Sequence, residues 1–250
     1  MCYIPEKEIT EDLERIIVAH LKKLLHEKHL LKCLWRTSNP VFTTLLKSLN
    51  AIPSNSGCWF RMDPKKVNEH KLLDWITAVD PGKMGLNLSY TGFIPNNMLD
   101  EVALVSNEMM NDMQREDNSL AFHVDADYLR HAQFNTAKMK QQPHHLFLRD
   151  KAGKIIGISM ILTDHTGTLA DQRMTGIVKE WRGMGLAKWL KAKMLLKIRT
   201  DMPAITNIRT ECFSTNFPMI SINAALGFEL YRTDNDFFVS PSILESFLHS

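Results

Sequence analysis

Residues 175–188 read TGIVKEWRGMGLAK, and this segment is the most informative part of the chain. A run of strand-forming residues leads into a loop with two glycines, and the loop opens an amphipathic helix. The first N–H groups of a helix lack intrahelical acceptors, and the helix dipole adds partial positive charge there. Gly183 and Gly185 lack the Cβ atoms that would keep a phosphate away from the backbone, and Arg182 adds a fixed charge. The segment therefore predicts a binding site for a phosphate group.

Two familiar phosphate-binding loops do not fit this spacing. The P-loop requires G-x-x-x-x-G-K-[ST], and no matching Gly-Lys pair follows Gly183. The dinucleotide pattern G-x-G-x-x-G begins well at Gly183 and Gly185, but Lys188 stands at its third glycine. That pattern also belongs after the first strand of a domain, whereas several elements precede this one.

Outward from this segment, hydrophobic periodicity predicts an alternating α/β chain. Beyond residue 84 we expect strands near 85–92, 144–150, 154–164, 168–178, 205–213 and from 228, and helices at 96–114, 126–140, 184–200 and 217–226. Before residue 84 we expect helices at 8–26, 40–50 and 65–78, and extended segments at 30–36 and 59–62. The basic residues of the 184–200 helix should form a solvated face: Lys188, Lys191, Lys193, Lys197 and Arg199.

The composition excludes several classes of protein. The 250 residues are 44% hydrophobic and 23% charged, which suits a full hydrophobic core and excludes a disordered chain. A formal charge of +2 argues against a dedicated nucleic-acid or membrane-surface protein. The four cysteines form no C-x-x-C pair, so we expect no metal site. The apolar run at 155–162 is too short to span a bilayer, so we expect a cytoplasmic protein.

A short internal repeat relates the two ends of the chain. Residues 38–50 (SNPVFTTLLKSLN) align without gaps onto residues 215–227 (TNFPMISINAALG), and the elements before both segments follow in the same order. We therefore predict that residues 1–63 are the rear half of a degenerate second copy of one unit. Residues 64–83 would connect it to a complete domain at 84–250.

The chain resembles the GCN5-related N-acetyltransferase superfamily, whose members carry R/Q-x-x-G-x-G/A after the fourth strand. Arg182, Gly185 and Ala187 match that motif. Residues 215–228 resemble the N-x-x-M-x-x-x-N-x-x-L-G-F signature of members with two such domains in tandem. The resemblance implies an α/β (α+β) fold, with a mixed, mostly antiparallel sheet flanked by helices and a splayed fourth and fifth strand. A partial half-domain would precede it.

The same resemblance implies acetyl-CoA as co-substrate and assigns residues to it. The pyrophosphate would be held by the loop residues Arg182, Gly183, Met184, Gly185, Leu186 and Ala187. The pantetheine arm would lie in the gap between the splayed strands and pair with the backbone of Ile177 and Val178. Thr175 and Gly176 would lie nearer the thioester, and Asn216 and Asn223 would line the far wall.

The proton-transfer residues are less well defined. Asp171 stands about where the histone-acetylating branch of the superfamily carries a catalytic Glu, but it also fits a surface residue at the start of a strand. His123 is a second candidate base. Many members have a general-acid Tyr where this chain has Asn223, and Asn cannot protonate a leaving thiolate. Either water serves, or another residue such as Tyr231 or Cys212 does.

Taken together, these features predict an acetyl-CoA-dependent N-acetyltransferase acting on a small amine. A protein amine, a longer acyl group and a non-catalytic acyl-CoA sensor are the alternatives. In the repeat register Arg182 lies opposite Pro5, and the glycine loop lies opposite Glu6-Lys7-Glu8-Ile9-Thr10, which lacks glycine. The first copy therefore cannot bind CoA in this manner. It would extend the sheet, wall the acceptor cleft, or form a homodimer interface.

Overall fold

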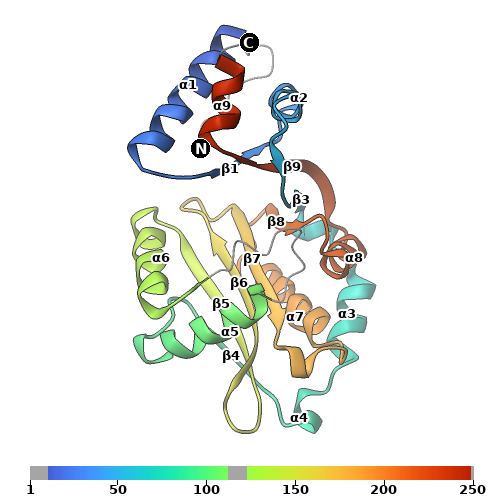
Figure 1. Ribbon diagram of the computed structural model, residues 1–250. Coiled ribbons are helices and arrows are strands. Elements are labelled where there is room, and N and C mark those ends of the chain that lie inside the picture. Colours follow the sequence, from blue (N-terminus) through green and yellow to red (C-terminus); the bar gives the residue numbers. More distant parts are fainter. Residues whose placement is uncertain (1–10, 112–122, 249–250) are drawn as a thin grey trace.

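The computed structural model describes residues 11–111 and 123–248 (Figure 1). Its strands are β1 (Cys33–Thr37), β2 (Ile52–Pro53), β3 (Gly57–Met62), β4 (Asn87–Thr91), β5 (Gln142–Arg149), β6 (Ile155–Thr163), β7 (Leu169–Ile177), β8 (Asn207–Phe213) and β9 (Glu229–Val239). Its α-helices are α1 (Glu11–Glu27), α2 (Pro40–Ser48), α3 (Glu69–Thr77), α4 (Pro81–Met84), α5 (Leu99–Asn111), α6 (Ala126–Lys138), α7 (Leu186–Asp201), α8 (Phe217–Leu226) and α9 (Pro241–Leu248). Three single 3-10 turns are η2 (Pro64–Lys66), η3 (Asn96–Met98) and η4 (Lys179–Trp181).

The strands form one mixed sheet in the order β1-β9-β3-β8-β7-β6-β5-β4, with β2 pairing beside β9. Neighbouring strands are antiparallel except β7 and β8, which are parallel. Helices lie on both faces, with α5 and α6 on one face and α7 on the other (Figure 1). Coverage on both faces explains why β6 is buried at nearly every position. The predicted fold class is confirmed.

The long strand β9 joins two bodies. Its first half, residues 229–234, pairs with β3 in the large sheet, and its second half pairs with β1 and β2. Figure 1 shows β9 running from the large sheet to a smaller body made of α1, α2, β1 and α9. The strand β3 comes from the N-terminal part of the chain, yet it lies between β8 and β9.

Two hydrophobic cores follow this arrangement. The larger core includes residues from β3 to Phe228, with Ile158, Trp189 and Leu190 among its buried members. The smaller core combines α1, α2, the end of β9 and α9: Val18, Leu25, Phe42, Leu45, Leu46, Ala51, Phe237, Val239 and Leu244. The cores therefore divide the chain differently from the predicted boundaries at 63 and 84. Those boundaries stay a prediction about the repeated sequence unit.

Most predicted elements are present within a few residues of the expected bounds. Asn39 caps α2 by accepting a hydrogen bond from the Val41 amide, and Pro40 occupies the first turn. The expected helix at 65–78 is divided into η2 and α3, because the Asn68 side chain starts a new helix by capping the Lys71 amide. Part of the expected 96–114 helix, residues 112–114, lies outside the described residues.

Candidate functional site

The parallel pair β7 and β8 diverges partway along its length. The two strands pair only between residues 169–172 and 207–210. Beyond that point β7 continues to Ile177 with β6 as its partner, while β8 continues to Phe213 with β3 as its partner. The facing edges of β7 and β8 therefore separate, which confirms the predicted splay.

The backbone of β7 presents alternate residues to this gap. The Val178 amide donates to the Ile156 carbonyl at 2.9 Å, and the Val178 carbonyl accepts from the Trp181 amide at 3.0 Å. In an antiparallel ladder the hydrogen-bonding direction alternates, so the peptide groups of Ile177 and Thr175 point away from β6 and toward the gap. The structure thus brings Ile177 to the gap as predicted. Both backbone groups of Val178 are already bonded within the chain, so its pairing with pantetheine stays a prediction.

The loop after β7 has the geometry expected of an anion site. Gly183 and Gly185 have φ of +80° and +77°, a region that strongly favours glycine. A Cβ built on Gly183 would meet no atom within 4 Å, so the space above it is open. Gly185 caps α7 without a side-chain hydrogen bond, and the first intrahelical bond runs from Trp189 to Gly185. The helix start therefore offers free N–H groups and, with no acidic residue in its first turn, a positive end.

The neighbouring loop residues differ in what they present. Arg182 is exposed, and its Nε donates to the Ile177 carbonyl at 2.9 Å, which ties the loop to the end of β7. Met184 is half-exposed, Ala187 is partly buried, and Leu186 is buried in the larger core. Leu186 would therefore contribute only its backbone N–H to an anion.

A buried polar cluster lies where the strands begin to diverge. The Gln172 Nε2 donates to Ser159 Oγ at 3.0 Å and to Thr175 Oγ1 at 2.8 Å. Gln172 is 3% exposed, and its Oε1 has no hydrogen-bond partner among the described residues. A buried carbonyl oxygen without a partner is costly in a folded protein. The cluster is thus suited to a ligand that carries an N–H donor, such as an amide.

The helix α8 follows β8 in the chain and carries both predicted asparagines. The Asn216 Oδ1 accepts from the Met219 amide at 3.2 Å, so this side chain caps the helix. Asn223 is fully buried, and neither its Oδ1 nor its Nδ2 has a partner among the described residues. Of the two residues, Asn223 has polar atoms left to bind a ligand.

Asp171, the predicted base, forms an ion pair with a residue of the neighbouring strand. Asp171 lies in the paired stretch of β7, directly opposite Arg209 of β8. Its carboxylate accepts from Arg209 Nε at 2.8 Å and from Arg209 Nη2 at 3.0 Å, and this bond raises the pKa of Arg209. Arg173 lies 3.9 Å from the same carboxylate. This bidentate ion pair ties the Asp171 carboxylate to Arg209, and its role as the base stays a prediction.

The other three candidates for proton transfer are His123, Tyr231 and Cys212. His123 is exposed, and its Nε2 lies 3.9 Å from Asp125 Oδ2. Tyr231 is 36% exposed on β9, with the Arg61 guanidinium 5.5 Å from its ring. Burial raises the pKa of Cys212 to about 12, so its thiol is a poor acid. The roles of His123 and Tyr231 stay predictions.

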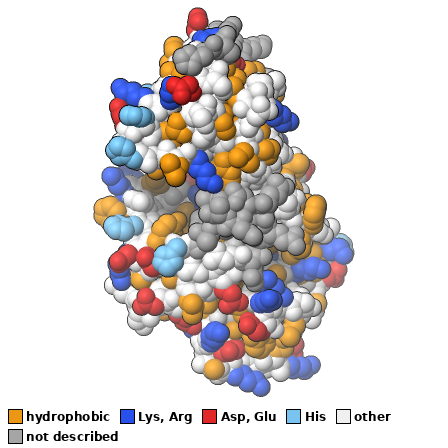
Figure 2. All heavy atoms as spheres, in the orientation of Figure 1, with side chains coloured by type: hydrophobic (Ala, Val, Ile, Leu, Met, Phe, Trp, Pro, Cys, Tyr) orange, Lys and Arg blue, Asp and Glu red, His pale blue; other side chains and the backbone are white. Residues whose placement is uncertain are grey.

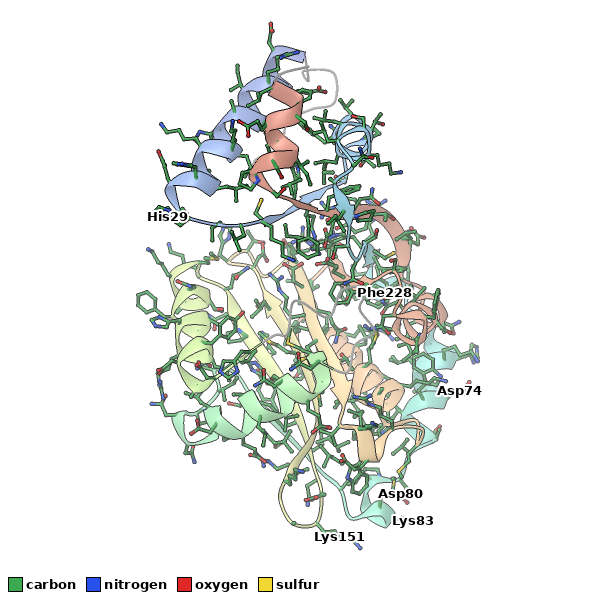
Figure 3. The ribbon with its side chains drawn as sticks, in the orientation of Figure 1. His29, Asp74, Asp80, Lys83, Lys151 and Phe228 are labelled. Atoms are coloured by element: carbon green, nitrogen blue, oxygen red, sulfur yellow. The ribbon has the colours of Figure 1, made fainter. Side chains whose placement is uncertain are left out.

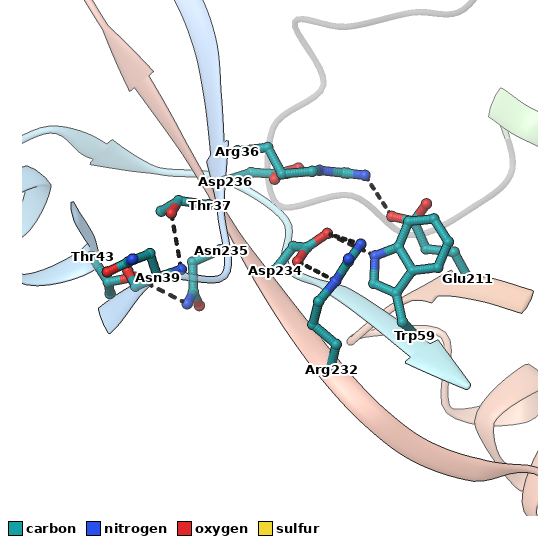
Figure 4. Close-up of polar contacts among 10 residues, drawn as sticks. All are labelled: Arg36, Thr37, Asn39, Thr43, Trp59, Glu211, Arg232, Asp234, Asn235 and Asp236. Atoms are coloured by element: carbon teal, nitrogen blue, oxygen red, sulfur yellow. Dashed lines mark hydrogen bonds and ion pairs between the residues drawn. The ribbon is translucent and has the colours of Figure 1, made fainter. Parts of the chain in front are cut away.

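Sequence reasoning missed a charged network on the face of β8 that bears Arg209 (Figure 4). Arg36 of β1 binds both carboxylate oxygens of Asp236 at 2.7 and 2.9 Å, and its Nη1 binds Glu211 at 2.6 Å. Trp59 Nε1 donates to Asp234 Oδ2 at 2.7 Å. Burial, the largest cause, raises the pKa of Glu211. The partners are more than 170 positions apart, so no local pattern could reveal them.

The sequence also misplaced Lys191. It was expected on a solvated face of α7, yet it is 1% exposed, and its Nζ lies 3.9 Å from the Met219 sulfur. The other basic residues of this helix remain at least partly accessible. On the face drawn in Figure 2, charged side chains of both signs are interspersed over the described residues.

The described residues offer no candidate for a metal site or a membrane-spanning helix. The described residues contain no group of three or more His, Cys, Asp or Glu side chains placed to hold a metal ion. Among those same residues, no helix has the length and apolar character needed to cross a membrane.

Comparison with known proteins gives structural relatives only. No family model and no curated protein matches the chain. A solved tandem GNAT protein from the clavulanic acid biosynthesis pathway superposes with a TM-score of 0.71 at 22% identity, over 96% of this chain and 73% of that one. A GCN5-related N-acetyltransferase from Kribbella flavida gives 0.58 at 10% identity, over 93% and 77%. Another from Sphaerobacter thermophilus gives 0.55 at 11% identity, over 84% of this chain and 59% of that one. The chain has the fold of GCN5-related N-acetyltransferases.

Proposed function

We propose that this chain is an acetyl-CoA-dependent N-acetyltransferase with a small amine as acceptor. The observation that carries the proposal is the splay of β7 from β8, which leads directly into the open two-glycine loop at the start of α7. The same fold in solved acetyltransferases supports it. Fold alone does not define an activity, so the argument depends on the fit of these residues.

Both the pyrophosphate and the pantetheine arm of CoA match polar groups of the protein. Its pyrophosphate matches the open N–H groups of residues 183–188 and the positive end of α7. Its pantetheine arm contains two amides, which match the peptide groups of Thr175 and the amide of Ile177 along the edge of β7, since the Ile177 carbonyl is held by Arg182. Gln172 on β7 and Asn223 on α8 have polar atoms without partners among the described residues. A bound arm would thus satisfy polar groups that are otherwise buried without partners.

The chemistry follows from this placement. In the fold family the acceptor amine attacks the thioester directly, so the protein mainly aligns two bound reactants. A backbone N–H of β7 near Thr175 would donate to the thioester oxygen and stabilise the negative charge that develops there. Because Asp171 is held by Arg209, we do not assign it the role of base.

A non-catalytic acyl-CoA sensor is the second candidate. It is favoured by Asn223, which stands where a proton donor is usual and is fully buried. The two functions differ in one observable, since only the enzyme releases free CoA thiol when an amine is supplied. A protein amine as acceptor would give the same release with peptide substrates.

The test is a thermal-shift titration with acetyl-CoA, CoA and ATP, followed by a thiol-release screen against a panel of amines. A ligand at about 100 times its Kd adds roughly 2.7 kcal/mol of stability, which is a shift of several degrees. We expect both CoA species to stabilise the protein. No shift with acetyl-CoA at millimolar concentration would refute the proposal.

Gly183→Ala tests the loop, with Gly153→Ala as its matched control. Both glycines have positive φ, +80° and +83°, and neither would gain a contact from a Cβ. Each substitution should therefore cost about 1–2 kcal/mol of backbone strain. We expect only Gly183→Ala to weaken acetyl-CoA binding, by about tenfold or more, because only this Cβ faces the phosphate. Equal affinity in the two variants would count against the loop as the binding site.

A further inference from the structure

Lys191 is a buried lysine without a carboxylate partner among the described residues. It lies on α7, six positions after Gly185, and is 1% exposed. Its Nζ lies 3.9 Å from Met219 Sδ and 5.2 Å from the centroid of the Phe228 ring, which is labelled in Figure 3. A thioether is a weak acceptor, so two of the three ammonium donors have no strong partner here. Burying a charged group in an apolar site without a strong partner is costly, and a functional role would explain why this lysine is there.

Lys191 faces the part of β8 that no longer pairs with β7. The titratable group that faces it is the thiol of Cys212, two residues past the last pairing of β8 with β7. Met219 and Asn223 are four positions apart on α8 and so share a face of that helix. Lys191 therefore lies where α7, α8 and the wall of the splay meet, beside the unpartnered Asn223.

The reaction needs a proton donor at this place. When acetyl transfer completes, the C–S bond breaks and the electron pair goes to the sulfur of CoA. Asn223 has no acidic proton, and the Cys212 thiol has its pKa raised to about 12. We propose that the Lys191 ammonium donates the proton to this sulfur. The inference rests on the proposed function.

The step balances without a further reagent. The acceptor nitrogen forms the new C–N bond, the thioester C–S bond breaks, and one N–H proton of Lys191 moves to the thiolate. Lys191 is left as a neutral amine, and it regains a proton from solvent, which receives the one lost by the acceptor. The products are the amide and CoA with its thiol protonated.

The electrostatics of the site suit this role. Desolvation is the main cause that lowers the pKa of Lys191 to about 7, and the Cys212 thiol opposes it. An acid is most effective when its pKa is near the working pH, and it then loses its proton readily to a more basic thiolate. From α8 and from Phe228 the lysine meets only a thioether and an aromatic ring. Cys58, which pairs with Cys212 across β3 and β8, and Glu211 lie beyond that thiol.

The test measures the thiol of enzyme-bound CoA, so it needs no acceptor. Thiolate ultraviolet absorbance would be followed against pH for the wild type, Lys191→Met and the control Lys193→Met on the same helix. A proton shared between Lys191 and the sulfur leaves part of the bound CoA as thiolate paired with the ammonium near neutral pH, so we expect Lys191→Met to remove this thiolate fraction and shift the thiol titration to higher pH. Lys193→Met should match the wild type. Lys191→Gln repeats the measurement if the Met variant does not fold.

A second readout applies to any amine found to release thiol. We expect Lys191→Met to lower kcat by about a hundredfold with little change in the Kd of acetyl-CoA. It should also remove the fall in kcat above about pH 7 that the wild type shows as Lys191 loses its proton. Unchanged thiol pKa with intact CoA binding overturns the role of Lys191 and leaves the proposed function standing. Failure of the wild type to bind CoA overturns both.

Discussion

At the scale of single residues, the buried Lys191 lowers the free energy of unfolding. In the unfolded chain a lysine has a pKa of about 10.5, whereas burial lowers that of Lys191 to about 7. Below about pH 7 the residue is charged in both states, so the folded protein bears the full cost of a buried charge. Between about pH 7 and 10.5 only the unfolded state binds the proton, so the free energy of unfolding rises with pH.

Lys191→Met should therefore stabilise the protein near and below neutral pH. The methionine keeps the length of the side chain and adds no charge, so it removes the desolvation cost without leaving a large cavity. We expect a melting temperature several degrees above the wild type near pH 6, with a difference that shrinks as the pH rises toward 9. Thermal denaturation at a series of pH values measures this, with Lys193→Met as the control. A variant less stable than the wild type at every pH would mean that the amine is satisfied by a partner.

Residue patterns predicted the conformation of the glycine loop but not the burial of Lys191. The two glycines could be assigned because positive φ and an open approach are local requirements, which the spacing within 182–187 already states. Lys191 could not, since its neighbours on the helix are also basic and only the packing of α8 makes this one buried. The ion pair of Asp171 could not be predicted either, because its partner Arg209 comes from a different strand.

At the scale of elements, the contact of β1 with β8 depends on Arg36. This side chain joins the smaller body to the large sheet by binding Asp236 of β9 and Glu211 of β8 (Figure 4). Asp236 is 3% exposed, so its carboxylate depends on the guanidinium for compensation. The bond to Asp236 is also the main cause that raises the pKa of Arg36. Loss of one partner would leave an isolated buried charge.

Arg36→Met should accordingly destabilise the protein by about 3 kcal/mol, the lower end of the range for breaking a buried pair, because Arg36 is itself partly exposed. Adding Asp236→Asn should recover a large part of this loss, since the uncompensated charge is then gone. Denaturant unfolding of both single variants and the double variant measures the coupling free energy. Lys22→Met serves as the control, because the Lys22–Glu245 pair is exposed and should contribute under 1 kcal/mol. Additive losses at Arg36 and Asp236 would refute the coupling.

The pairing of elements was less predictable than their presence. The residues WFRM indicate an extended segment at 59–62, within the observed β3, but they do not say which strands become its neighbours. Its place between β8 and β9 joins residues more than 140 positions apart, and such long-range contacts leave no periodic signal. The splay itself was expected only through the family resemblance.

At the scale of the whole molecule, the position of β3 bears on where a complete domain begins. The sequence repeat places residues 84–250 in one unit, yet β3 fills a central position of the sheet that this unit forms. Cys58, Phe60 and Met62 of β3 all belong to the larger core. Without β3, the strands β8 and β9 would each lose a neighbour, and the wall of the proposed site would face solvent.

Two truncations test whether the complete domain begins at the repeat boundary or must include β3. Removing residues 1–51 deletes α1, β1 and α2 but keeps β3, so the larger core remains whole while Phe237, Val239 and Leu244 become exposed. Removing residues 1–63 also deletes β3. We expect the shorter deletion to unfold cooperatively and to bind acetyl-CoA, although with lower stability and solubility.

The longer deletion should fail in both respects, because the loss of β3 opens the sheet beside β8 and removes three buried side chains from the core. Near-ultraviolet circular dichroism and thermal denaturation with and without acetyl-CoA measure the outcome for each chain. Cooperative unfolding and acetyl-CoA binding by residues 64–250 would show that β3 is dispensable and that the repeated unit is a domain by itself. The expected failure would instead mean that the N-terminal segment completes the sheet on which the proposed acetyl-transfer site is built.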